Sequence, residues 1–390
     1  MAEGQPQTRR SVRLWIALAV LASLVLFLTS CTTPYRHPQL RPADAGFAGI
    51  DELFGPETPE VDVLLIHGMG THTETWVQSM VNQLAAALGF PAPTILPPAD
   101  SLPHDAKHYR YALTSANRNL QISAVLWSPV TSPAKATLCY DVTQPTSLCT
   151  DRTVFSKDRR AWANALIKSQ IMDDRLSDVT FYLNEDGGRQ IREAIQDALL
   201  RSLSAQGLSL DQLSAGATPT AKTAPLFVIS ESLGSKIVVD SLKEFETRHQ
   251  TQAFAQQTRG NIHTLFLLAN QIPILNLSVR IRSRDSPHYP HLTELAQARN
   301  ADRNPRLPDV PLHVVAFSDP NDLFSYQLVS NADPPTARHH QQCRRLQRPH
   351  RPRVVREPAD RPHLLSPELA GGESDCARFR CISEFNGNRL

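Results

Sequence analysis

Short apolar runs alternate with amphipathic stretches along most of the chain, and this alternation predicts an α/β fold. Five runs are rich in β-branched and aliphatic residues, which is typical of strands buried in a parallel sheet. They lie at 61–66, 121–127, 226–229, 262–268 and 312–317. The amphipathic stretches 75–88 and 233–246 predict helices. Because strands alternate with helices, we expect a mostly parallel central sheet with right-handed crossovers and flanking helices.

A long insertion, 128–224, separates the second and third predicted strands. It holds Cys139 and Cys149 on either side of a loop rich in Pro, Thr and Ser, followed by predicted helices at 158–172 and 185–203. In an oxidising compartment the two cysteines could pair as a disulfide, and two free thiols are the alternative. A helical insertion at this place could cover an active site as a lid or pack as scaffold. The sequence leaves both interpretations open.

The first 31 residues predict export and attachment to lipid. A basic start at 9–13 precedes the apolar run Leu14–Leu28, which is shorter than the roughly 20 residues of a membrane-spanning helix. The run ends in Leu28-Thr29-Ser30-Cys31, which resembles the bacterial lipobox, whose cysteine is acylated. The resemblance implies a lipid bilayer as partner, most simply the outer membrane facing the periplasm. An uncleaved N-terminal anchor is the alternative.

Composition adds limits on the class of function. Residues 32–60 are rich in Pro, Ala and Gly and predict a flexible tether, which leaves 61–337 as the folded domain. A net charge of +2 with 20% charged residues indicates no nucleic-acid partner. Outside the tail, the sequence has no phosphate-binding loop, dinucleotide fingerprint or His/Cys set with metal-ligand spacing. We therefore expect no metal and no organic cofactor, and the sequence does not indicate an oligomeric state.

The third predicted strand runs into a helix through a turn with a serine at its apex. The segment reads Leu226-Phe227-Val228-Ile229-Ser230-Glu231-Ser232-Leu233-Gly234 and resembles the nucleophile elbow of α/β-hydrolases, G-x-S-x-G. Small residues flank such a serine because the strand and the helix approach closely. Gly234 keeps its place, whereas Ser230 replaces the first glycine. Ser232 is the predicted nucleophile, and a solvent-facing loop serine is the alternative.

A second segment fits the same family. His67-Gly68-Met69-Gly70 follows the first strand, where α/β-hydrolases carry an H-G turn. By that resemblance the backbone N–H groups of Met69 and Leu233 form an oxyanion hole. Gly68, Gly70 and Gly234 then support the turns, and His67 holds its own turn without acting as the base.

The acid of a catalytic triad is expected after the last predicted strand. Asp322 resembles the family's acid, and Asp319 is the alternative, which otherwise caps the turn before Pro320. The chain from 61 to about 328 therefore resembles the α/β-hydrolase superfamily. The resemblance implies a serine hydrolase that cleaves carboxylic esters, including lipid esters, through an acyl-enzyme. Acyl transfer to an acceptor other than water would use the same residues.

The histidine that such a triad requires is not identified. Residues 338–390 are rich in Arg, Pro and His, lack lysine, and show no recognisable strand or helix, as in a disordered basic tail. Codons compatible with Pro362–Glu368, read one base later, permit His-Thr-Ser-Tyr-Leu-Gln-Asn. A frameshift near Arg338 is therefore a second interpretation. The base is then His363 or is lost, and a chain without it would be a non-catalytic binding or scaffold lipoprotein.

Overall fold

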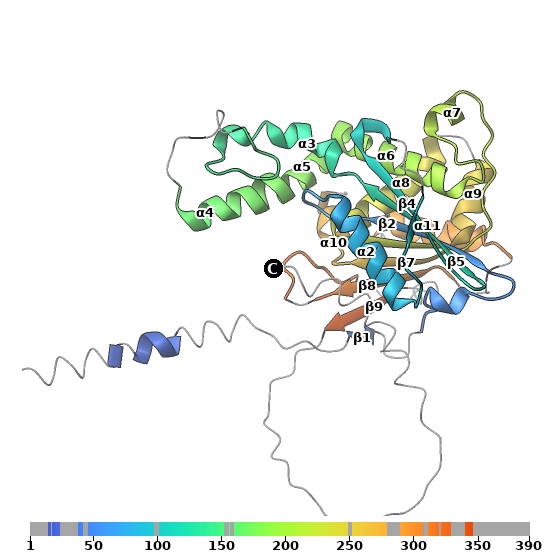
Figure 1. Cartoon of the computed structure of the whole chain (residues 1–390), viewed down its shortest axis with the longest axis horizontal. Helices are drawn as coiled ribbons and strands as arrows, with labels where there is room; N and C mark the ends of the chain where they lie inside the picture. The colour runs from blue at the N-terminus through green and yellow to red at the C-terminus, as the bar shows by residue number, and fades with distance from the viewer. Residues whose placement is uncertain are drawn as a thin grey trace, which may run out of the picture.

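The computed structural model describes residues 15–16, 18–23, 38–41, 46–96, 101–151, 156, 160–248, 252–278, 289–305, 307, 311–319, 321–328 and 340–345. Within these residues the strands form one sheet in the order β1-β9-β8-β7-β6-β2-β5-β4-β3 (Figure 1). The consecutive strands from β9 to β5 run parallel to one another. The predicted α/β fold with a mostly parallel sheet is confirmed.

The elements have the following bounds. The parallel strands are β2 (Glu60–Ile66), β5 (Arg118–Leu126), β6 (Leu226–Glu231), β7 (Ile262–Leu268), β8 (His313–Ser318) and β9 (His340–Arg345). The other strands are β1 (Pro38–Arg41), β3 (Thr94–Ile95) and β4 (Lys107–Ser115). The helices outside the insertion are α2 (Glu74–Ala87), α8 (Leu233–Arg248), α9 (Gln252–Asn261), α10 (Ile272–Leu275) and α11 (Pro290–Ala301).

Alternate residues of the parallel strands point to opposite faces of the sheet and build a core on each side. On one face, Ile66 and Val228 pack with Ile237 of α8. On the other, Leu65 and Ile229 pack with Val81 of α2. Burial on both faces explains why the strands are continuous apolar runs.

The segment predicted to be a flexible tether, 32–60, is packed on the domain in its described part. Ile50 and Leu53 are buried, and the ring of Phe47 lies 5.9 Å from that of Phe266 in β7. Strand β1 pairs with β9 in an antiparallel register. The folded domain therefore begins before residue 61.

The tail, 338–390, was predicted to have no strand, but it contains β9. Strand β9 pairs in parallel with β8, with Val314 opposite His340. The sequence of β9, His-Gln-Gln-Cys-Arg-Arg, has no apolar run, so only backbone pairing identifies it as a strand. Residues 346–390 lie outside the described residues, as does Cys31.

The insertion, which connects β5 to β6 along the chain, folds into a helical layer. It contains α3 (Ser128–Ala136), α4 (Trp162–Ile167), a π-helix (Lys168–Leu176), α5 (Ser177–Leu183), α6 (Glu185–Leu203) and α7 (Leu210–Ser214). Helix α6 packs against α8, where Gln196 Nε2 donates to the carbonyl of Ser241 over 3.4 Å. Helix α4 lies at the far end of this layer from the sheet (Figure 1).

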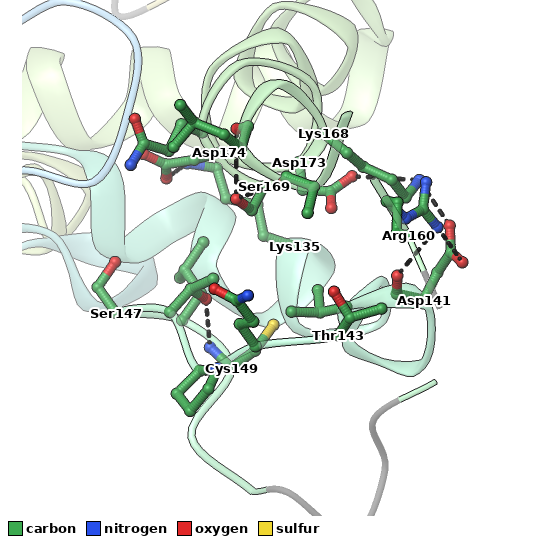
Figure 2. A pocket seen from close by; sticks show the side chains of 18 of the residues that line it. Lys135, Asp141, Thr143, Ser147, Cys149, Arg160, Lys168, Ser169, Asp173 and Asp174 are labelled. Atoms are coloured by element: carbon green, nitrogen blue, oxygen red, sulfur yellow. Dashed lines mark hydrogen bonds and ion pairs between the residues drawn. The ribbon is translucent and has the colours of Figure 1, made fainter. Parts of the chain in front are cut away.

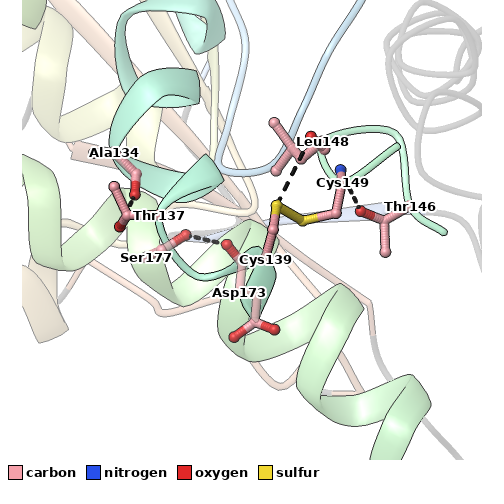
Figure 3. The surroundings of a disulfide bond; sticks show 8 residues. All are labelled: Ala134, Thr137, Cys139, Thr146, Leu148, Cys149, Asp173 and Ser177. Carbon is pink, nitrogen blue, oxygen red and sulfur yellow. Dashed lines mark hydrogen bonds between the residues drawn. A yellow bond between two sulfur atoms is a disulfide. The ribbon is translucent and has the colours of Figure 1, made fainter. Parts of the chain in front are cut away.

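A disulfide joins Cys139 and Cys149 and closes a short loop in the insertion (Figure 3). Both cysteines are buried together with Val142. Inside the loop, the Cys149 N–H donates to Thr146 Oγ1 over 3.0 Å. The cross-link holds the loop 140–148 beside the π-helix.

Replacing both cysteines with serine should lower the free energy of unfolding by about 3 kcal/mol. The cysteines are 10 residues apart, and the cross-link removes loop-closure entropy from the unfolded chain. Urea unfolding of the full-length chain with and without dithiothreitol measures the effect. Dithiothreitol should destabilise the wild type and leave the double variant unchanged. Equal stability of both proteins without reductant would show that the bond contributes nothing.

Candidate active site

The candidate site lies where the connections of the sheet diverge. The chain leaves β2 toward β5 on one side, and β6 pairs with β2 on the other. Ligands of open α/β sheets bind outside the carboxyl ends of the strands at such a switch point. Ile66 pairs with Ser230 at these ends, so His67 and Ser232 follow on adjacent strands.

Ser232 has a left-handed backbone conformation, with a φ of 54°. This conformation is disfavoured for residues other than glycine and is found at functional sites where the surrounding structure enforces it. The Ser232 N–H donates to the carbonyl of Leu268 over 2.7 Å, and the Ser232 carbonyl accepts from Ser235 N–H over 3.1 Å. Among the described residues, the Ser232 hydroxyl has no hydrogen-bond partner. The turn thus fixes the backbone of Ser232, while its Oγ remains available for other interactions.

Two glycines make this turn possible by close approach. A Cβ on Gly68 would lie 2.8 Å from the Cβ of Ser232, and one on Gly234 would lie 2.5 Å from the carbonyl oxygen of His67. Ser230, where the motif has a glycine, is fully buried. Its Oγ lies 3.4 Å from both Ser235 Oγ and the carbonyl oxygen of Phe266. A small side chain with two polar neighbours therefore fits where glycine is usual.

His67 is fully buried and uses both ring nitrogens to hold the turn. Its Nδ1 lies 2.7 Å from the Gly68 carbonyl oxygen. Its Nε2 accepts from the N–H groups of Trp127 and Ser128 over 2.9 and 3.2 Å. These bonds assign the proton to Nδ1. Burial holds the pKa of His67 well below its ordinary value, so the ring is neutral. The contacts fit the predicted turn support and leave no nitrogen for proton transfer.

The two predicted oxyanion donors lie on facing turns. Leu233 is the first residue of α8, and a first-turn N–H has no partner within its helix. Met69 follows Gly68, and its side chain packs against the core. Among the described residues, neither the Met69 nor the Leu233 N–H has a hydrogen-bond partner. Both donors are therefore available to a developing negative charge, which the N-terminus of α8 also favours.

A charged cluster of the insertion, Lys135, Asp174 and Asp178, is hydrogen-bonded to the turn next to Met69. The Gly70 N–H donates to Asp178 Oδ2 over 2.6 Å, and the Thr71 N–H donates to Asp174 Oδ1 over 3.0 Å. Lys135 Nζ lies 3.1 Å from Asp174 Oδ1 and 2.7 Å from Asp178 Oδ1. Lys135 and Asp178 are buried. This end of the insertion is therefore fastened to the turn, which favours the scaffold interpretation here.

Sequence reasoning did not identify this cluster. Its members come from α3, the π-helix and α5, and the two aspartates are more than 100 residues away from the turn that they hold. The i, i+4 spacing of Asp174 and Asp178 was the available signal, since it places both carboxylates on one helical face. Gly70 has a φ of 100°, so its glycine is required by conformation.

The two candidate acids follow β8 and have different surroundings. Asp319 Oδ1 accepts from the Asn321 N–H over 3.0 Å, which is the predicted turn cap. Asp322 Oδ1 accepts from the Phe324 N–H over 3.0 Å. Burial raises the pKa of Asp322, while the Phe324 N–H and, more weakly, the charge of Arg175 oppose this rise.

Asp322 lies at the same edge of the sheet as Ser232, beyond the loop that follows β7. The Ala269 N–H donates to the Phe317 carbonyl over 3.0 Å, and the Tyr326 N–H donates to the Asn270 carbonyl over 2.9 Å. These bonds hold the loops after β7 and β8 side by side. A histidine would have to connect Asp322 with Ser232 in a triad. His363 lies outside the described residues.

Within the described part of the chain, no group of three or more His, Cys, Asp or Glu side chains could hold a metal ion. No described helix has the length and apolar character needed to cross a membrane. Comparison of the chain with protein-family models, curated proteins and solved structures finds no match. The interpretation of the site therefore depends on its own residues.

Gly234→Ala should lower the free energy of unfolding by about 1–3 kcal/mol, because its methyl group would overlap the His67 carbonyl and force the turn to shift. Gly49→Ala is the matched control, since a Cβ there meets nothing within 4 Å. The control should be unchanged or stabilised by up to about 1 kcal/mol. Denaturant unfolding of both variants measures the difference. Equal effects would contradict the close packing of Gly234.

Asp178→Ala should destabilise the protein by about 3–5 kcal/mol, because it leaves Lys135 partly unpaired in a buried site and frees the Gly70 N–H. Asp186→Ala is the control, since Asp186 forms an exposed ion pair with Arg189, and such pairs contribute about 0–1 kcal/mol. Thermal and urea unfolding measure both effects. If Asp178→Ala lowers the free energy of unfolding no more than the control does, the charged cluster does not stabilise the turn.

Proposed function

We propose that the protein is a serine hydrolase that cleaves carboxylic esters through an acyl-enzyme on Ser232. The left-handed conformation of Ser232, at the turn from β6 into α8, carries this proposal. A serine strained between a strand and a helix presents its Oγ at the edge of the sheet, next to the first N–H groups of the helix. The facing turn at Gly68 and Met69 supplies the second donor.

The order of the turns along the chain supports an α/β-hydrolase fold for this site. The H-G turn follows β2, the serine follows β6, and Asp322 follows β8. In that fold the oxyanion donors come from the residue after the nucleophile and from a loop nearer the N-terminus, and the acid follows the serine in sequence. Both features match the positions of Leu233, Met69 and Asp322.

The proposed reaction proceeds in two steps. Ser232 Oγ attacks the ester carbonyl carbon while a general base accepts its proton, and the Met69 and Leu233 N–H groups stabilise the oxyanion. The alcohol leaves with a proton, and water then hydrolyses the acyl-enzyme by the same route. The general base is expected from 338–390, with His363 as the candidate, because His67 is committed to its turn.

Exposed apolar side chains at the same edge of the sheet favour an acyl-ester substrate. Leu277 follows α10, and Leu323 is next to Asp322; they are 79% and 86% exposed. Apolar surface near an ester-cleaving serine suits acyl chains, and acylation of Cys31 would place the enzyme beside lipid esters.

A binding or scaffold lipoprotein is the second candidate. The observation that favours it is that, among the described histidines, none forms a hydrogen bond with the Ser232 hydroxyl. Such a protein would keep the turn at Ser232 for its packing. The two candidates differ in whether Ser232 reacts.

Labelling of the full-length chain with a fluorophosphonate probe tests the proposal. The wild type should be labelled, and Ser232→Ala should lose both labelling and at least about a thousandfold of esterase activity. Ser230→Ala is the control and should keep its label, because alanine is small enough for that position. Labelling that persists in Ser232→Ala would exclude this nucleophile. A folded wild type that is not labelled would favour the binding protein.

A further inference from the structure

The insertion contains a cavity of about 360 Å³ between the disulfide loop and the π-helix (Figure 2). Its lining includes the cations Lys135, Arg160, Lys168 and Arg175 and the acids Asp141, Asp173 and Asp174. The walls also carry hydroxyl and amide groups from the loop, among them Thr143 and Gln144. Apolar side chains, among them Leu148 and Leu166, also line the cavity, so it can receive a polar group of a ligand together with an apolar part.

Most of the charges that line this cavity neutralise one another. Arg160 and Lys168 lie 2.9 and 2.6 Å from the carboxylate of Asp141. Lys135 is held by Asp174, which also accepts from the turn at Thr71. Because these cations are already in ion pairs, they line the cavity but attract an anion only weakly.

Arg175 differs from the other cations of the lining. It is exposed, and among the described residues its guanidinium has no ion pair or hydrogen bond. A planar guanidinium with free N–H groups binds carboxylate and phosphate through paired hydrogen bonds. Arg175 is thus the cation of this lining that is available to a ligand.

Two observations place Arg175 near the turn that follows β2. Its Cγ and Nε lie 3.5 and 3.8 Å from the position that a Cβ on Gly70 would occupy. Gly70 is two residues from Gly68, which packs against Ser232. The positive charge of Arg175 also opposes the rise in the pKa of Asp322 that burial causes. Arg175 therefore lies beside the turn that faces Ser232, at the C-terminal end of the π-helix that lines the cavity.

We propose that Arg175 selects esters that carry an anionic group, a carboxylate or a phosphate, by binding that group at the mouth of the cavity while Ser232 attacks the ester. This inference rests on the proposed function and narrows it to anionic esters. The charged part of such an ester faces the insertion, and its apolar part lies along the apolar edge near Leu277 and Leu323. Arg175 then acts as a residue that determines specificity.

Two matched pairs of esters test the proposal with the full-length protein. One pair compares p-nitrophenyl butyrate with the p-nitrophenyl monoester of glutaric acid, and the other compares butyrylglycerol with butyrylglycerol 3-phosphate. The pairs place the charge on the acyl side and on the alcohol side. Arg175→Gln should lower kcat/KM about tenfold or more for the anionic member of at least one pair. Its kcat/KM for the neutral members should stay within about twofold, and Arg175→Lys should recover part of the loss.

Arg189→Gln is the matched control, because Arg189 is a partly exposed arginine of α6 that pairs with Asp186. It should leave all four rates unchanged. An equal loss on neutral and anionic esters in Arg175→Gln, or no loss on either, would overturn the proposal. So would a wild type that shows no preference for either anionic ester.

Binding to the Ser232→Ala variant separates this inference from the proposed hydrolysis. Isothermal titration with the same four esters should show tighter binding of an anionic member, and adding Arg175→Gln should remove that preference. A binding preference in a protein that hydrolyses none of the esters would overturn the hydrolase and keep the anion site. If Ser232 hydrolyses the esters but Arg175→Gln changes neither rate nor binding, the hydrolase is kept and the anion site is overturned.

Discussion

The close approach of two backbone turns is the constraint on which the rest of the site depends. Gly68 contacts the Cβ of Ser232, and Gly234 contacts the carbonyl of His67, so neither glycine can carry a side chain without moving the turns apart. This contact holds Ser232 in its left-handed conformation, which costs about 1–3 kcal/mol. The parallel sheet with a core on each face provides the rigid support that such strain requires.

The turn at Gly68 is supported both from the sheet side and from the insertion. On the sheet side, the neutral ring of His67 stacks on Trp127 at 4.6 Å between ring centroids and accepts two backbone N–H groups. From the insertion, Asp178 accepts the N–H of Gly70 and Asp174 accepts the N–H of Thr71. The turn at Gly68 therefore depends on the insertion as much as on the sheet, although the bonded residues are far apart in sequence.

The parts of the fold that follow a local pattern could be predicted, and the parts that depend on distant partners could not. Strand β7 and helix α6 have the predicted bounds, because a continuous apolar run and a long amphipathic period determine them. The strand β4 was missed because Lys107–Ser115 buries mainly one face and mixes charged residues with apolar ones. Flanking residues predicted the turn at Ser232 between a strand and a helix, whereas nothing local connects Asp178 with Gly70.

Pairing of β1 with β9 also limits how far the domain can move from its proposed anchor. Six residues, 32–37, separate Cys31 from the start of β1 at Pro38. Even fully extended, they reach only about 20 Å. An acyl chain on Cys31 would therefore keep the start of β1 within about 20 Å of the bilayer surface. The domain's reach would cover esters in that membrane and exclude those embedded in an opposing one.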